Sequence, residues 1–350
     1  MSDGVNIRRE GRAGCITLTR PDALNALSYT MCLAIDAALR DWAEDDAVAL
    51  VLIDAEGTRA FCAGGDIAQM YATGRAGDYS YGRRFWVDEY RMNARIARYR
   101  KSVVSFLQGF TMGGGVGLGC HTSHRIVGAT SQIAMPECSI GLVPDVGGTK
   151  WLAQAPGHLG AYLGLTGARM APGDAIRAGF ADFFLPESQW QDLKAALRES
   201  GDLGAITPHP APEAELQPHL AEIDHAFGAP RLEQLLPGLE AAGTEFSAKT
   251  AKAIRRNAPL SVACTLEMLR RLGPDAEIED ALAQELRFTW RSMEQGDFIE
   301  GIRAAIIDKD RNPRWRHARA EDVTGDEVAA MLAPLGADEL QLDLGEEADA

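Results

Sequence analysis

The spacing of hydrophobic and polar positions changes along the first half of the chain, and each change predicts a different element. Residues 5–19 alternate with a period of two, which predicts a short hairpin. Within 28–42 apolar side chains recur every three or four positions, so we expect a helix with Ser28 as its N-cap. Apolar runs at the start of 48–54 and across 103–107 are typical of buried parallel strands. Short strands that alternate with helices indicate an α/β core.

Helical periodicity becomes more frequent further along the chain. Residues 75–99 are polar and aromatic, and we expect a helix there after Tyr81. Two more short strands are predicted at 126–129 and 133–134. The remaining predicted helices are 151–164, 173–178, 231–241, 245–257, 261–271, 278–295, 297–307 and 326–332.

The character of the chain changes at about Pro186. Strand signals end there, and four prolines between positions 208 and 218 mark a loop. We therefore expect three regions, which are an α/β core over 1–190, a helical region over 191–320, and a mobile acidic tail over 321–350.

Composition and charge narrow the class of protein. A hydrophobic fraction of 46% and a charged fraction of 24% are ordinary for a soluble globular chain. The net charge of −15 argues against a nucleic-acid partner. Ten acidic residues and no Lys or Arg follow Arg319, and without them 35 basic residues face 40 acidic ones, a balance of −5. The body of the protein is therefore compatible with an anionic ligand.

The cellular compartment is predicted from three further features. No apolar run approaches the ~18 residues of a membrane helix, so no membrane partner is expected. The N-terminal residues show neither an export signal nor an organelle presequence. Six scattered cysteines without CxxC spacing argue against a disulfide framework or metal site, and make a reducing cytoplasm the expected location.

Candidate chemistry gathers between positions 103 and 148. Five glycines lie within 113–119, and two carboxylates, Glu137 and Asp145, follow eight residues apart. Glycine amides can approach a ligand closely, and a glycine-lined pocket with carboxylates suits acyl chemistry through an oxyanion. A second glycine turn, 64–65, follows the strand at 48–54. The residues alone fit tight turns with surface acids equally well, so both interpretations stay open here.

Other polar residues give weaker signals. Glu89 lies in the predicted helix after Tyr81, and its spacing alone favours a solvated helix face. Cys120, His121 and His124 match no metal-binding spacing. No GxSxG sequence is present to support a serine triad.

Several longer motifs occur in a fixed order, namely RPDALNAL (20–27), FCAGGDI (61–67), QGFTMGGGVGL (108–118), AMPE (134–137), GLVPDVGG (141–148) and FIEGIRAAIIDKDRNPRW (298–315). Over about residues 5–320 they resemble the crotonase (enoyl-CoA hydratase/isomerase) superfamily. The resemblance implies a crotonase-like spiral of ββα units followed by a C-terminal helical layer that covers the active site. It also implies an acyl-CoA substrate. Coenzyme A then belongs to the substrate, no separate cofactor or metal is expected, and a homo-oligomer is possible.

The resemblance also assigns roles to residues of this sequence. It implies that the backbone amides of Gly65 and Gly114 form an oxyanion hole and that Glu137 and Asp145 are catalytic. It further implies that Glu89, Gly114, Glu137 and Asp145 contact the substrate.

Two departures from the superfamily pattern point to a subclass. Hydratases carry a second glutamate just after the glycine cluster, where this chain has Gly117, and commonly carry glycine where this chain has Asp145. This pattern fits the hydrolase branch, which acts on short hydroxyacyl-CoA thioesters such as 3-hydroxyisobutyryl-CoA in valine breakdown. An isomerase or hydratase-type enzyme is the alternative, and a non-catalytic acyl-CoA-binding protein on the same fold is a third.

Overall fold

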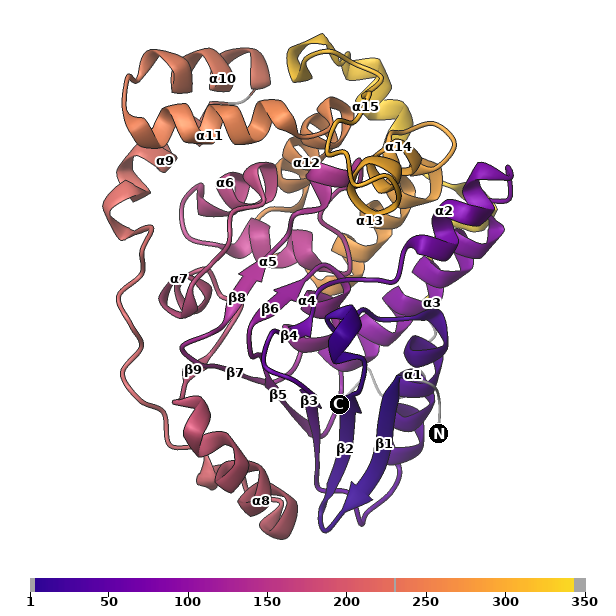
Figure 1. The fold of residues 1–350 in the computed structure, drawn as a ribbon, viewed down its shortest axis with the longest axis vertical. Coiled ribbons are helices and arrows are strands. Elements are labelled where there is room, and N and C mark those ends of the chain that lie inside the picture. Colours follow the sequence, from indigo (N-terminus) through magenta and orange to yellow (C-terminus); the bar gives the residue numbers. More distant parts are fainter. Residues whose placement is uncertain (1–3, 230, 343–350) are drawn as a thin grey trace.

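A computed structural model describes residues 4–229 and 231–342 (Figure 1). Its strands are β1 Val5–Glu10, β2 Ala13–Leu18, β3 Leu50–Ala55, β4 Ala60–Cys62, β5 Ser102–Phe106, β6 Phe110–Met112, β7 His124–Val127, β8 Gln132–Ala134 and β9 Phe183–Phe184. They form a six-stranded sheet in the order β1-β2-β3-β5-β7-β9 and a three-stranded sheet in the order β4-β6-β8. The β1–β2 hairpin is antiparallel, and the other pairings in both sheets are parallel.

The chain repeats one path three times. It runs along a strand of the large sheet, enters a strand of the small sheet, and returns to the large sheet through helical segments, giving the pairs β3–β4, β5–β6 and β7–β8 before the chain reaches β9. Because each new pair lies parallel to the previous one, the repeats stack into a spiral. The predicted α/β spiral of ββα units is therefore confirmed.

The first helices are α1 Tyr29–Ala43, α2 Ala68–Arg75, α3 Ser80–Ala97, α4 Gly114–Gly119, α5 Gly148–Gln154, α6 Leu159–Thr166, α7 Pro172–Arg177 and α8 Trp190–Ser200. Ser28 caps α1 as predicted, because its hydroxyl accepts the Met31 amide at 3.3 Å. The single helix expected over 151–164 is instead two helices, α5 and α6. The break contains Pro156 and Gly157, and the positive φ of this glycine is a backbone conformation that favours glycine over other residues.

The later helices are α9 Leu220–Phe227, α10 Leu232–Ala241, α11 Glu245–Arg256, α12 Pro259–Leu272, α13 Ile278–Ser292, α14 Phe298–Ile302 and α15 Gly325–Met331. Helices α10, α11, α12 and α15 gather at the end of the molecule opposite β1, β2 and α8 (Figure 1). Helix α13 packs against α3 and α5, and α12 packs against α5 and α6. The C-terminal helical layer therefore lies directly on the helices that follow the glycine and carboxylate motifs.

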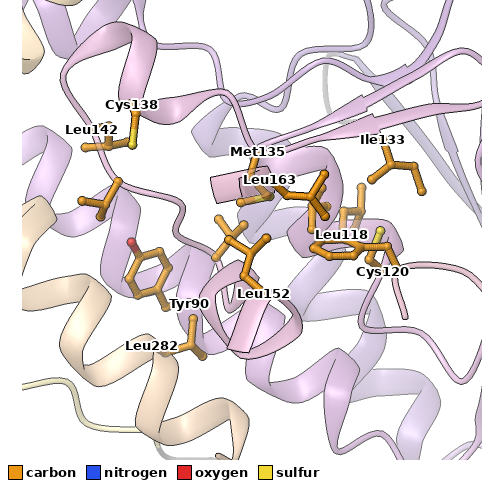
Figure 2. Packing of buried hydrophobic residues seen from close by; sticks show 14 of the residues in the cluster. Tyr90, Leu118, Cys120, Ile133, Met135, Cys138, Leu142, Leu152, Leu163 and Leu282 are labelled. Atoms are coloured by element: carbon orange, nitrogen blue, oxygen red, sulfur yellow. The ribbon is translucent and has the colours of Figure 1, made fainter. Parts of the chain in front are cut away.

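A continuous apolar core joins the spiral to this layer. Figure 2 shows buried side chains from α3, α4, β8, α5, α6 and α13 gathered in one cluster, including Leu118, Leu152 and Leu282. Each of these three leucines is at most 2% exposed. Full burial of one leucine stabilises a fold by roughly 1.5–3 kcal/mol, so the helical layer is held to the spiral by apolar contact.

The acidic C-terminal segment has packed structure as far as Leu342. Met331 and Leu332 are buried, and the Arg287 guanidinium on α13 donates to the Glu339 carboxylate at 2.6 Å. Residues 343–350 lie outside the described residues. The mobility of the tail and the boundaries between the three regions stay predictions. Within the described chain, no helix combines the length and apolar character needed to cross a membrane.

Candidate active site

Three buried carboxyl groups line one cavity of about 390 Å³. Glu89 comes from the middle of α3, Glu137 begins the short 3₁₀ helix Glu137–Ile140, and Asp145 lies in the loop before α5. Each of the three residues is 4% exposed. Gly65 and Gly114 line the same cavity, so the fold brings together the five residues singled out in the sequence.

Two glycine turns form part of the wall because two neighbouring strands lead into them. Strands β4 and β6 are parallel, and the chain beyond them turns at Gly64-Gly65 and at Gly113-Gly114. The positive φ angles of Gly64 (+117°) and Gly113 (+50°) favour glycine at the two turns. A Cβ added to Gly114 would lie 3.3 Å from the Gly65 nitrogen, so the two backbones are in close approach. Among the described residues, neither the Gly65 nor the Gly114 amide donates a hydrogen bond.

Glu137 faces the glycine turn from the third strand of the small sheet. Strand β8 pairs with β6, and Glu137 follows β8 by three residues. A Cβ added to Gly113 would lie 2.9 Å from Oε1 of Glu137, and Oε2 of Glu137 has no hydrogen-bond partner. Burial raises the pKa of Glu137 well above its ordinary value, and the charge of Asp145 raises it further.

The side chain of Asp145 lines the cavity, and its carboxylate accepts one hydrogen bond from the protein. The Tyr90 hydroxyl on α3 donates to Oδ2 of Asp145 at 2.9 Å. Burial raises the pKa of Asp145 to about 7, although the bond from Tyr90 lowers it. A carboxyl group of this kind exchanges a proton near neutral pH.

The interpretation of Glu89 as part of a solvated helix face was wrong. The face of α3 that carries Glu89 packs toward α4, whose glycines let the two helices approach closely. A Cβ on Gly114 would lie 2.8 Å from Oε1 of Glu89, and this oxygen has no hydrogen-bond partner. Burial raises the pKa of Glu89 well above its usual range, with a further rise from the charge of Asp145.

The remaining wall is largely apolar, with Met70, Phe85, Trp86, Leu142 and Phe298 among its side chains. Such a wall gives an acyl group apolar surface to pack against, and the three carboxyl groups and the glycine amides lie beside it. The site is therefore suited to a small acyl group with a polar carbonyl.

Tyr90 and Glu285, which no motif of the sequence marks as site residues, both hold the loop that carries Asp145. Glu285 on α13 is fully buried, and it accepts hydrogen bonds from the amides of Gly147 and Thr149 at 2.7 and 3.0 Å. No signal in the sequence connects Glu285 with this loop, because the two are separated by about 140 residues and meet only through helix packing.

His121 does not have the environment of a metal ligand, because both of its ring nitrogens make hydrogen bonds within the protein. The Trp151 indole N–H donates to Nδ1 of His121 at 3.2 Å, so Nε2 carries the ring hydrogen and donates to the Val146 carbonyl at 2.7 Å. Burial lowers the pKa of His121 to about 3, and the ring is neutral. Over residues 4–229 and 231–342, no three His, Cys, Asp or Glu side chains are grouped as metal ligands.

A spiral of ββα units whose glycine turns and carboxyl groups share a cavity under a helical layer defines a crotonase-type fold. Solved structures agree. An enoyl-CoA hydratase from Rhodobacter sphaeroides superposes with a TM-score of 0.95 at 61% identity, covering 97% of this chain and 100% of that one. A carnitinyl-CoA dehydratase from Mycobacterium thermoresistibile superposes with a TM-score of 0.93 at 38% identity, covering 97% and 99%.

The sequence profile of enoyl-CoA hydratase/isomerase matches residues 13–332, and the chain belongs to this family. Curated relatives are similar over nearly their whole length. The mitochondrial 3-hydroxyisobutyryl-CoA hydrolase of Gallus gallus is 37% identical over 352 residues, which are 97% of this chain and 91% of that protein. The human protein of the same name is 33% identical over 353 residues, with the same coverage.

Proposed function

We propose that this protein hydrolyses the thioester of a short hydroxyacyl-CoA, most of all 3-hydroxyisobutyryl-CoA, to the free hydroxy acid and CoA. The observation that carries the proposal is the cavity in which Glu137 and Asp145 lie with the two glycine turns, Gly65 and Gly114. The relatives from Gallus gallus and human, which are named for this hydrolysis, support it.

In this proposal the thioester carbonyl oxygen lies between the amides of Gly65 and Gly114. Both amides lack a protein acceptor among the described residues, and the close approach of the two turns allows them to donate to one oxygen. A donor of this kind stabilises a developing oxyanion by about 3–4 kcal/mol. The preformed arrangement requires little reorganisation as the negative charge develops.

Glu137 begins the reaction in one of two ways. It attacks the carbonyl carbon to give a mixed anhydride, which water then hydrolyses, or it takes a proton from water as the water attacks. In both routes a C–O bond forms at the carbonyl carbon, the C–S bond breaks, and the leaving thiolate gains a proton. Asp145 orients the acyl group and supplies that proton, for which a carboxyl pKa of about 7 is suitable.

Hydration of an enoyl-CoA fits this site less well. A Cβ on Gly117 would lie 2.7 Å from Nδ2 of Asn93 and 2.7 Å from Cβ of Val146. The start of a second glutamate side chain is therefore blocked by these two residues, in addition to being absent from the sequence. An isomerase needs only one carboxylate and leaves Asp145 and Glu89 without a role.

The hydroxyl group of the substrate gives Glu89 a partner. Its Oε1 is buried without a hydrogen bond, and a purely apolar acyl chain leaves it so. A hydroxyacyl group donates a hydrogen bond to this oxygen, and sites built around such a bond discriminate against analogues that lack it.

The pathway and the compartment rest on different grounds. The proposed substrate places the reaction in valine breakdown. The six cysteines, all free and buried, favour a reducing compartment. The cytoplasmic location expected from the sequence stays a prediction, and the relatives carry a mitochondrial location in their names. The homo-oligomeric state also stays a prediction.

The test is a panel assay that follows thiol release and enoyl absorbance separately. We expect thiol release from 3-hydroxyisobutyryl-CoA, followed in kcat/KM by 3-hydroxypropionyl-CoA, and lower values for isobutyryl-CoA and long-chain acyl-CoA. Double-bond migration or hydration without thiol release would instead identify an isomerase or hydratase. Binding without any turnover would identify an acyl-CoA-binding protein.

A further inference from the structure

The turn that carries Asp145 has an unfavourable backbone conformation. Val146 has a φ of +53°, which is rare for a β-branched residue, and Gly147 follows with a φ of +78°. Such a conformation persists only where surrounding contacts hold it. The contacts that hold this turn therefore decide where the Asp145 carboxylate lies.

Contacts from two directions fix the backbone of the turn. On one side, Nε2 of His121 donates to the Val146 carbonyl at 2.7 Å. On the other side, the two carboxylate oxygens of Glu285 accept the Gly147 amide at 2.7 Å and the Thr149 amide at 3.0 Å. The hydroxyl of Thr149 donates to the same carboxylate.

The burial of Glu285 shows that this contact is specific. The residue is 0% exposed, and a buried carboxylate is unfavourable unless several donors pair with it. Its donors belong to one short segment, 147–149, which begins two residues after Asp145. Glu285 therefore connects α13 of the C-terminal layer to the loop of the cavity.

We propose that Glu285 is a positioning residue that acts through Asp145, by holding the strained turn at Val146 in the form that directs the Asp145 carboxylate into the cavity. This inference rests on the proposed thioester hydrolysis, and it assigns to the C-terminal helical layer a part in assembling the site. A residue that only joins α13 to α5 would stabilise the fold without acting through Asp145.

A double-mutant cycle separates these two roles. Glu285→Gln keeps the size of the side chain but replaces one acceptor oxygen with an amide donor that opposes the backbone N–H groups. We expect kcat for 3-hydroxyisobutyryl-CoA to fall about 10–100-fold with KM changed less than threefold, as for a catalytic group displaced by about 1 Å. In the Asp145→Asn background the Glu285→Gln change should lower the remaining kcat less than about threefold, because in this proposal Glu285 affects the reaction only by positioning Asp145.

One further variant serves as a control, and another replaces Glu285→Gln if that protein does not fold. Gln284→Ala alters the neighbouring buried residue on α13, which donates to the Met268 carbonyl and has no hydrogen bond to the turn. Gln284→Ala should lower the melting temperature without the loss of kcat expected for Glu285→Gln. If Glu285→Gln fails to fold, Thr149→Val removes one of the three donors while preserving shape, and it should show the same pattern at smaller magnitude. Equal losses of kcat in the wild-type and Asp145→Asn backgrounds would overturn the proposal.

A second readout does not depend on turnover. Hydrogen exchange of the whole chain reports the amides of Gly147 and Thr149, and we expect at least about tenfold faster exchange there in Glu285→Gln but not in Gln284→Ala. If the wild type releases no thiol, the proposed function fails and exchange alone decides whether Glu285 holds the turn. Unchanged exchange at Gly147 and Thr149 would reject the positioning role.

Discussion

The hydroxyl of Tyr90 donates a 2.9 Å hydrogen bond to Oδ2 of Asp145, although the two residues are 55 positions apart. This bond favours the charged carboxylate and so lowers the pKa of Asp145. Burial has the opposite and larger effect, and the resulting pKa is about 7. Tyr90 therefore tunes the group that we propose as the proton donor to the leaving thiolate.

Tyr90→Phe keeps the aromatic ring and removes the donor, so the pKa of Asp145 should rise. Because the proposed donor acts in its protonated form, the basic limb of the kcat–pH profile should move to higher pH. Tyr162→Phe, which removes a hydroxyl outside the cavity, should leave the profile in place. A basic limb that stays fixed or moves to lower pH would show that Asp145 is not this proton donor.

Glu137→Gln preserves size but removes the nucleophile or base. We expect kcat to fall at least ~100-fold, as for an acid–base group, with substrate affinity largely retained. The matched control is Asp174→Asn, because Asp174 is also buried but accepts the Leu216 amide outside the cavity. Near-normal thiol release by the Glu137 variant would remove this residue from the mechanism.

Gly114→Val places a branched side chain 2.8 Å from Oε1 of Glu89 and 3.3 Å from the Gly65 nitrogen. The thioester carbonyl is then kept away from the two amides, and activity should fall about 100-fold or more. Circular dichroism should show a retained fold. Gly238→Val is the control, since a Cβ at that position meets nothing within 4 Å. A fully active Gly114 variant would argue against an oxyanion hole here.

The wild-type protein should show negligible hydration of crotonyl-CoA. Gly117→Glu should not create that activity, because the new Cβ would lie 2.7 Å from Asn93 and Val146 and force the Asp145 loop to move. We expect this variant to lose thioester hydrolysis as well. The measurement is loss of enoyl absorbance without CoA release, and efficient hydration by the wild type would overturn the hydrolase assignment.

Glu89→Ala should reduce the preference for hydroxylated substrates more than it reduces hydrolysis itself. The wild type should favour 3-hydroxyisobutyryl-CoA over isobutyryl-CoA by more than about tenfold in kcat/KM, because the hydroxyl pairs with a buried acceptor. In the variant the ratio should approach one. Equal values for both substrates in the wild type would contradict the proposed specificity and leave thioester hydrolysis standing.

The sequence by itself determined the local elements and the residues of the candidate site. Alternation before residue 20 predicted the hairpin, and the spacing after Ser28 predicted α1 with its cap, because both patterns depend on neighbours a few positions away. Long motifs in fixed order likewise selected Gly65, Gly114, Glu137 and Asp145. The structure places all four around one cavity.

Only the tertiary structure decided which polar side chains are buried and what they contact. The periodicity around Glu89 could not distinguish a solvated face from one that packs on the glycine helix α4, because that depends on a partner more than twenty residues away. The same holds for Tyr90 and Glu285, which reach the Asp145 loop from α3 and α13. A helical pattern records which side chains share a face, whereas the partner of that face is set by non-local packing of the whole chain.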